Sequence, residues 1–238
     1  MTSSRFIRLT DALSARLSRR TALTGVSAAA LASQARVGAQ TGTPAADSAT
    51  QVGIAPPGTN AFEFVGVVQQ LGLDFSLTAY VTNLAGVDSA LLFEEADPLA
   101  RSEANARLLL SGTGTGTARS ILDNLFVVNA EGAVTFSIGG PGASFADAAS
   151  FEAGTPIASM SVSLQDVINV QALQQGLATG YGTFIIDSTN AFDLGGASTV
   201  LAAPGTRYRL SFTGQGTLQD PATLNAFILI AGNCVVAG

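Results

Sequence analysis

The side chains on which most catalytic and metal sites depend are missing from this sequence. It contains no histidine, and all eleven of its basic residues are arginines, so lysine is absent as well. These absences exclude serine–histidine catalysis, histidine-bound zinc and Schiff-base formation on lysine. The single cysteine, Cys234, excludes an internal disulfide and cysteine-rich metal clusters. Carboxylates, tyrosines, arginines and hydroxyls remain, and we expect no cofactor and no metal chemistry.

Asp166 is the candidate for acid–base catalysis. If the surrounding strand continues without interruption, Asp166 lies on the same face as Leu164 and Ile168. A carboxyl group among apolar side chains needs a partner or has a raised pKa. A β-bulge near Gln165, or the end of the strand there, would instead remove the carboxyl group from that face. The second arrangement is the one that we predict.

The remaining polar candidates suggest two kinds of site. Three of the arginines and two tyrosines are candidates for binding a small molecule, because an arginine in a barrel with a polar lumen would attract an anion. On an outer face the same arginines would simply be solvated. Two aspartates in a turn offer oxygen ligands for calcium, although turn chemistry explains them equally well. These candidates are Arg107, Arg207, Arg209, Tyr80 and Tyr181 for the ligand, and Asp187 and Asp193 for calcium.

Strands must position all of these residues, because the dominant sequence period after Phe62 is two. In 73–82, for example, Leu73, Phe75 and Leu77 alternate with polar residues. Glycine, proline, aspartate and asparagine cluster between such runs and predict turns. We therefore predict an all-β fold, a single antiparallel barrel or sandwich of about nine or ten short strands. Apolar runs are short, so we expect a soluble protein that is not an integral membrane protein.

A comparison of the chain with itself predicts an internal two-fold duplication. Residues 107–117 align with residues 207–217, and seven of these eleven positions are identical. Upstream, the segment 69–73 resembles 174–177 in the same order. Similar glycine- and threonine-rich composition is the alternative explanation. The short alternating strands also resemble small antiparallel ligand-binding barrels of the lipocalin and allene-oxide-cyclase type, an architectural likeness that does not fix a function.

The N-terminus resembles a twin-arginine signal peptide. Arg19 and Arg20 follow a serine, a mildly apolar stretch comes next, and 37–39 is a small-residue cleavage signal that ends at Ala39. The resemblance implies transport by the twin-arginine translocase to the periplasm, the cell envelope or the exterior. We predict a signal peptide over 1–39, a flexible linker over 40–60 and one all-β domain over 61–238. An ordinary secretory signal is the alternative.

The charge balance limits the partners of the exported part. Six of the eleven arginines and one of the seventeen acidic residues precede residue 40, which leaves five arginines, sixteen acids and a net charge of −11. Such a chain repels nucleic acid and anionic lipid headgroups. The sequence thus favours an exported module that binds a small ligand or is structural. The alternative is a cofactor-free isomerase, cyclase or carboxylate-based hydrolase whose site lies in the barrel cavity.

Overall fold

The computed structural model describes residues 50–51, 55–140, 142–172, 175–220 and 225–237. The predicted signal peptide and its cleavage site lie outside these residues. The described part contains the strands β1 (Thr50–Gln51), β2 (Asn60–Leu71), β3 (Asp74–Leu84), β4 (Leu108–Leu122), β5 (Leu125–Ile138), β6 (Thr155–Ala172), β7 (Gln175–Thr189), β8 (Phe192–Leu194), β9 (Ala197–Val200), β10 (Arg207–Asp220) and β11 (Asn225–Val236). Four short 3₁₀ helices join them: η1 (Ser89–Leu92), η2 (Pro98–Ala100), η3 (Glu103–Asn105) and η4 (Ala148–Phe151).

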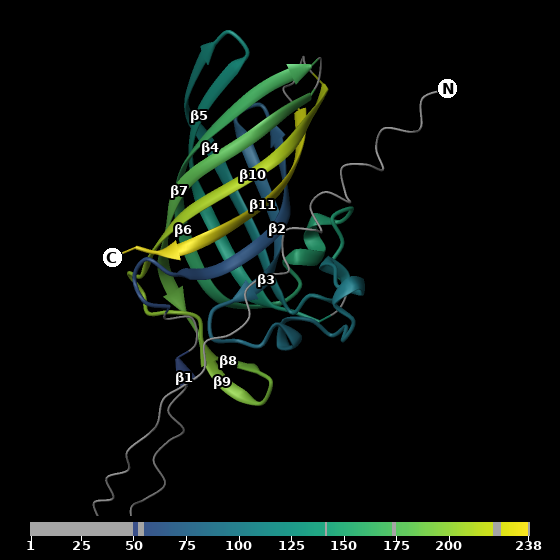
Figure 1. Cartoon of the computed structure of the whole chain (residues 1–238), viewed down its shortest axis with the longest axis vertical. Coiled ribbons are helices and arrows are strands. Elements are labelled where there is room, and N and C mark those ends of the chain that lie inside the picture. Colours follow the sequence, from purple (N-terminus) through teal and green to yellow (C-terminus); the bar gives the residue numbers. More distant parts are fainter. Residues whose placement is uncertain (1–49, 52–54, 141, 173–174, 221–224, 238) are drawn as a thin grey trace, which may run out of the picture. The chain divides into compact units, whose positions relative to one another are not determined.

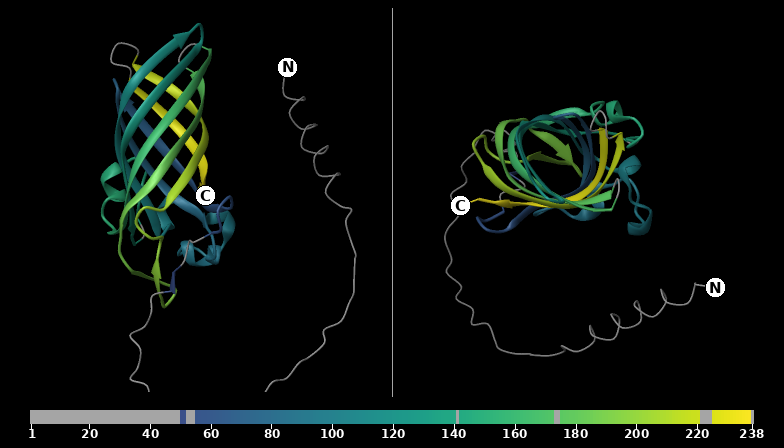
Figure 2. Two further views of the ribbon diagram at one scale, coloured as in Figure 1. Left: turned by 90° about the vertical axis from the view of Figure 1, so that its left-hand side faces the viewer. Right: turned by 90° about the horizontal axis from the view of Figure 1, so that it is seen from above.

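Eight strands close into an antiparallel barrel. Their order around the barrel is β10-β11-β2-β3-β4-β5-β6-β7, and the last strand pairs again with the first. The view from above in Figure 2 shows the resulting ring of strands. The prediction of an all-β fold is confirmed. Of the two predicted architectures, the structure has the barrel and not the sandwich. No helix in the described residues is long and apolar enough to cross a bilayer.

The alternation of side chains explains why these segments form barrel strands. In β3, Phe75, Leu77 and Ala79 pair with lumen-facing residues of β2, whereas Ser76 and Thr78 lie on the opposite face. Branched and aromatic side chains favour extended backbone, and burying one face of each strand in the lumen supplies the hydrophobic stabilisation. The described lumen-facing positions are thus almost all apolar or glycine.

The two ends of the barrel differ in their connections (Figure 1). At one end, which we call the hairpin end, β2 and β3, β4 and β5, β6 and β7, and β10 and β11 follow each other after two to four residues. The β4–β5 turn has only two residues, Asp123 and Asn124, and Asp123 adopts a left-handed φ of 54° that suits such a turn. The longer connections lie at the other end, the loop end, and contain the 3₁₀ helices and strands β8 and β9.

Part of the predicted linker forms a strand. Thr50 and Gln51 make up β1, which pairs in parallel with β9 in a small three-stranded sheet of order β1-β9-β8. The composition of residues 40–60 is typical of a flexible segment, and nothing in it indicates this pairing. Thr50 pairs with Thr199, which is 149 residues away in sequence, so local patterning carries no signal for this pairing.

The barrel places the two similar segments at equivalent positions. The first lies in β4 and the second in β10, and these strands are four apart in the eight-strand order, on opposite sides of the ring. Both run from the loop end to the hairpin end. In each, the leucine and the later glycines (Leu110, Gly114, Gly116 and Leu210, Gly214, Gly216) face the lumen. This arrangement is the one expected of two similar four-strand halves, β2–β5 and β6–β7 with β10–β11.

An aromatic plug fills the lumen at the loop end. Phe62, Phe136 and Tyr208, which we call the aromatic plug, are all nearly fully buried. The ring of Phe62 packs edge-to-face on Phe136 at 5.1 Å and on Tyr208 at 5.6 Å between centroids. Cys234 of β11 pairs with Phe62 of β2 and is fully buried, as expected for a small core residue. The loop end of the barrel is therefore solid.

Candidate functional site: the barrel lumen

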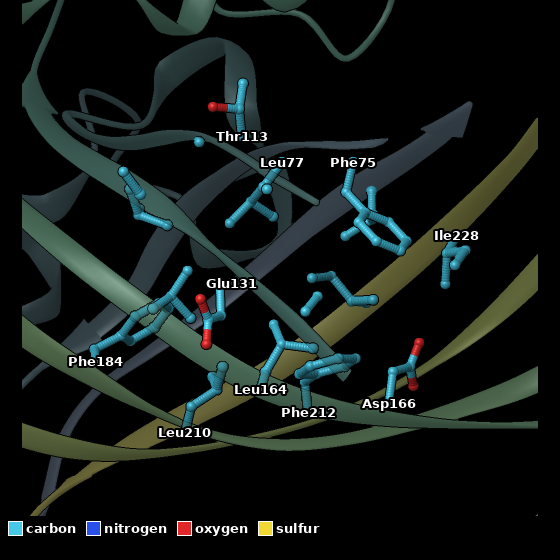
Figure 3. A pocket seen from close by; sticks show the side chains of 18 of the residues that line it. Phe75, Leu77, Thr113, Glu131, Leu164, Asp166, Phe184, Leu210, Phe212 and Ile228 are labelled. Atoms are coloured by element: carbon cyan, nitrogen blue, oxygen red, sulfur yellow. The ribbon is translucent and has the colours of Figure 1, made fainter. Parts of the chain in front are cut away.

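A cavity lies in the lumen between the aromatic plug and the hairpin end. Its volume is about 100 Å³, and almost all of its lining is apolar. Figure 3 shows the side chains that surround it. Strands from both halves of the barrel contribute to its wall: Val128, Leu164, Phe184, Leu210, Phe212 and Ile228.

Glycines in the lumen wall keep this space open. Gly112 and Gly114 of β4 and Gly132 of β5 face the lumen at neighbouring positions, because Gly112 pairs with Val134 and Gly114 with Gly132. The chains also approach closely here, since a Cβ on Gly132 would stand 2.7 Å from the Cα of Gly114. Any larger residue at Gly132 would require the backbone to shift. The cavity is hollow because of these absent side chains.

Asp166 faces this cavity, and the predicted β-bulge or strand end near Gln165 is wrong. Strand β6 pairs continuously with β5 through Gln165 and Asp166, opposite Asn129 and Val128, and continuously with β7 opposite Tyr181 and Gly180. The irregularities in the pairing of β6 lie elsewhere, between Pro156 and Ala158, between Ser159 and Met160, and between Val170 and Ala172 near the hairpin end. The uninterrupted alternation therefore carries the carboxyl group into the lumen with Leu164 and Ile168. Only 8% of Asp166 is exposed.

The lumen makes Asp166 an unusual carboxyl group. Its Oδ1 atom is buried and has no hydrogen-bond partner. Burial disfavours the charged form and raises the pKa from 3.8 to about 6, although the backbone N–H groups of Val167 and Thr179 lower it in part. No charged side chain contributes to this shift. At neutral pH the carboxyl group is therefore ionised without a counter-ion, and it gains a proton just below neutrality.

Phe212 occupies the space beside Asp166. Asp166 pairs with Gly180 of β7, and Gly180 pairs with Phe212 of β10, so the three residues form one row across the lumen wall. The ring of Phe212 lies over Gly180, because a Cβ on that glycine would stand only 2.0 Å from the tip of the ring. Figure 3 shows Asp166 and Phe212 at the same side of the cavity. Gly180 thus allows an aromatic ring to lie beside the carboxyl group.

Arg119 lies in the same row, although it is not among the residues predicted from the sequence. It pairs with Val128, which in turn pairs with Asp166, so the arginine and the aspartate are two strands apart on the lumen-facing side. Two strand spacings separate their backbones by roughly 10 Å. The guanidinium group lies 5.1 Å from the centroid of the Phe126 ring and is exposed near the hairpin end. A bulge between Gly116 and Ala118 exchanges the lumen-facing and outward-facing positions of the residues that follow. Strict alternation along β4 would therefore place Arg119 on the outer face.

The predicted ligand-binding residues do not converge on Asp166. Arg207, Arg209 and Tyr181 are exposed on the outer face, since they alternate with lumen-facing Tyr208, Leu210 and Gly180. Arg107 immediately precedes β4 and is half-buried, with a buried Nε atom that has no hydrogen-bond partner.

Tyr80 is also outside the lumen, in a second aromatic cluster. Its ring contacts Phe93 at 6.1 Å and Phe145 at 6.2 Å, and Phe145 stacks on Phe151 at 5.2 Å. These phenylalanines come from the loop-end connections, which fold back over β3 and β4. Burial, with a smaller contribution from the negative charge of Glu103, raises the pKa of Tyr80. Tyr80 therefore anchors the connections to the barrel.

Glu131 borders the cavity but belongs to the outer surface. It pairs with Thr115 and Ser163, and Thr115 donates a hydrogen bond to exposed Asp74 at 3.0 Å on the outside of the barrel. The Glu131 carbonyl oxygen lies 2.9 Å from the position of a Cβ on Gly114, so its main chain lies close to the glycine-lined part of the wall. The side chain is exposed, and Asp166 remains the acidic group that faces the lumen.

The two candidate calcium ligands, Asp187 and Asp193, each accept a hydrogen bond from a neighbouring group. Asp187 accepts a hydrogen bond from the Ser161 hydroxyl at 3.0 Å on the outer face of β6 and β7. Asp193 accepts one from the backbone N–H of Gly196 at 3.1 Å within the β8–β9 turn. Within the described ranges, no group of three or more carboxylate or thiol side chains is placed to hold a metal ion.

Comparison with known proteins gives no family or relative for this chain. No protein-family model matches it, and neither a curated protein nor a solved structure matches.

Proposed function

We propose that the barrel binds a small, largely apolar molecule in its lumen and that Asp166 holds one hydrogen-bonding group of that molecule. The observation that carries this proposal is the buried Oδ1 atom of Asp166, which has no partner and faces an apolar cavity. Small-molecule sites are commonly apolar cavities with a few polar groups that fix the orientation of the ligand.

The energetics of burial support a ligand at this position. A buried polar atom without a hydrogen bond costs on the order of 1–3 kcal/mol, and a donor on a ligand would offset that cost. The cavity volume of about 100 Å³ is sufficient for a molecule of a few carbon atoms, because dry cavities of roughly 150 Å³ bind benzene. The apolar wall would favour the rest of the molecule by the hydrophobic effect.

Acid–base catalysis in the same lumen is the second candidate function. The pKa of Asp166 near 6 favours it, since a carboxyl group with such a pKa exchanges a proton efficiently near neutral pH. The cofactor-free enzyme that the sequence suggested also needs a tyrosine or an arginine beside the acid. Tyr80, Tyr181, Arg107, Arg207 and Arg209 do not face the cavity. Binding therefore has the stronger support.

Native mass spectrometry of protein purified without denaturant tests the binding proposal. We expect extra non-covalent mass that is lost on denaturation. Ala130→Phe, which places a ring in the lumen, should remove this mass, whereas Ala231→Phe on the exposed outer face of β11 should retain it. Circular dichroism establishes that both variants fold. Equal retention of the extra mass by folded forms of both variants would show that the ligand is not in the lumen.

We also propose that the barrel acts outside the cytoplasm. Arg19 and Arg20 and the small residues that end at Ala39 support export by the twin-arginine route. The exported protein should have a denatured mass that begins at Gln40, and replacing both arginines by lysine should leave the full-length protein in the cytoplasm. Export that is unaffected by this double substitution would favour the ordinary secretory route.

A further inference from the structure

We propose that the ligand of the lumen is a small organic amine, a protonated ammonium group on an apolar body of about four carbon atoms, which forms an ion pair with Asp166. This inference rests on the proposed function and adds the chemical class of the ligand. It follows from the charge, the aromatic lining and the size of the cavity.

The lumen holds an uncompensated negative charge. The neighbours of Asp166 in its row are Val128 on β5, Gly180 on β7 and, beyond it, Phe212 on β10, and none of them carries a charge. Arg119 on β4 is the charged group closest to it in register, and its guanidinium group lies over Phe126. Arg119 makes no contribution to the pKa of Asp166, and the buried Oδ1 atom of the carboxyl group has no hydrogen-bond partner. A ligand cation would supply the missing counter-charge, and such charge-assisted hydrogen bonds are stronger than neutral ones.

One aromatic ring lies beside the place where an ammonium group would bind, and a second lines the same cavity. Phe212 lies beside Asp166, and Phe75 lines the same cavity from β3. The face of an aromatic ring attracts a cation, most strongly where water is excluded. An anionic head group would meet the Asp166 carboxylate and the rings without a compensating positive charge. The lining therefore favours a cation over an anion.

The rest of the molecule must be apolar and short. The other described side chains that face the cavity are aliphatic or aromatic, and its volume is about 100 Å³. A chain of about four carbons fits this volume, since a cavity of roughly 150 Å³ accepts the six carbons of benzene. The net charge of −11 over residues 40–238 also draws cations toward the protein and repels anions.

Calorimetric titration with three probes of equal length tests this inference. We would titrate the full chain with n-butylamine, n-butanol and butyrate at pH 7.5, where Asp166 is ionised. We expect n-butylamine to bind at least tenfold more tightly than n-butanol, because a hydrogen bond to a charged group is worth more than a neutral one. Butyrate should bind most weakly.

Two variants separate the role of the carboxylate from the role of the cavity. Asp166→Asn retains the shape of the side chain but removes its charge, so it should abolish the preference for the amine and leave n-butanol affinity nearly unchanged. Asp187→Asn, an exposed aspartate on the outer face of β7, is the matched control and should retain the preference.

Lowering the pH provides an independent measurement on the unaltered protein. Amine affinity should fall at least fivefold between pH 7.5 and pH 5, because Asp166 gains a proton near pH 6 while the amine stays charged. Butanol affinity should change little over this range.

The outcomes distinguish the two proposals. Equal binding of n-butylamine and n-butanol, both blocked by Ala130→Phe, would overturn the amine while supporting a lumen that binds small molecules. Preferential binding that survives in a folded Asp166→Asn variant would also overturn it. Absence of binding by all three probes, together with an unliganded native mass, would contradict both the amine and the proposed function.

Discussion

Replacing Asp166 by asparagine should stabilise the protein at neutral pH. Burial raises the pKa of the carboxyl group from 3.8 to about 6, and each pKa unit corresponds to about 1.4 kcal/mol. The ionised carboxylate therefore costs the folded state about 3 kcal/mol once the pH exceeds 6. Asparagine has nearly the same shape and no charge, so the variant avoids this cost.

The sign of the pH dependence follows from proton binding. Between pH 3.8 and about 6 the folded protein holds the Asp166 proton more tightly than the unfolded chain does. Stability of the wild type thus falls as the pH rises through this window, and it levels off above it. The free energy of unfolding of Asp166→Asn minus that of the wild type should rise by about 3 kcal/mol from pH 3.5 to pH 7.5.

Urea denaturation at several pH values measures this difference. Groups common to both proteins cancel in the subtraction, which isolates the contribution of residue 166. Asp187→Asn is the control, because its side chain is exposed on the outer face and should not reproduce the rise. A difference for Asp166→Asn that stays constant within about 0.5 kcal/mol from pH 3.5 to 7.5 would refute the reasoning. The carboxyl group would then be solvated rather than buried in the lumen.

Three further perturbations test the packing of the barrel. Gly180→Ala should destabilise the fold by about 1–3 kcal/mol in urea titrations and reduce ligand binding, because its Cβ would push the Phe212 ring into the cavity; Gly140→Ala, in open space, should do neither. Phe136→Ala removes a fully buried ring of the aromatic plug and should lower the free energy of unfolding by about 3–5 kcal/mol, and a loss below 1 kcal/mol would mean that the plug is not tightly packed. Burial raises the pKa of the Cys234 thiol, so a thiol reagent should modify it only as fast as the protein unfolds; rapid labelling under native conditions would contradict its burial.

Alternation of polar and apolar residues was enough to predict the all-β fold, but it was not enough to choose its closure. Each barrel strand buries one face, and a sandwich would produce the same local pattern. Closure depends on pairing between β7 and β10, which the short strands β8 and β9 separate in sequence. Such a non-local pairing leaves no signature in either strand alone.

The site was harder to predict than the fold because bulges change the facing of side chains. A bulge was predicted at Gln165, where none exists, and one exists between Gly116 and Ala118, where none was predicted. The first error would turn Asp166 out of the lumen, and the second hid Arg119. Each bulge reverses the facing of the residues that follow, so small errors in position move a side chain from one face to the other.

The similarity between residues 107–117 and 207–217 corresponds to equivalent positions in the barrel and is more than a likeness of composition. The two segments begin their strands at the same end of the barrel, and their shared glycines face the lumen from opposite sides. The two sides of the cavity differ where the two segments differ in sequence. Gly112 leaves space in β4, whereas the equivalent Phe212 in β10 places a ring beside Asp166.

Methyl-labelled NMR titration tests the central claim, binding in the lumen, most directly. n-Butylamine should shift the methyl signals of Leu164 and Ile228, which line the cavity, in a saturable manner. Leu229 is the next residue of β11 after Ile228, and its side chain is exposed on the outer face of the barrel. Its methyl signals should therefore not shift. Saturable shifts at Leu229 with none at Leu164 and Ile228 would place the binding site on the surface and contradict the account.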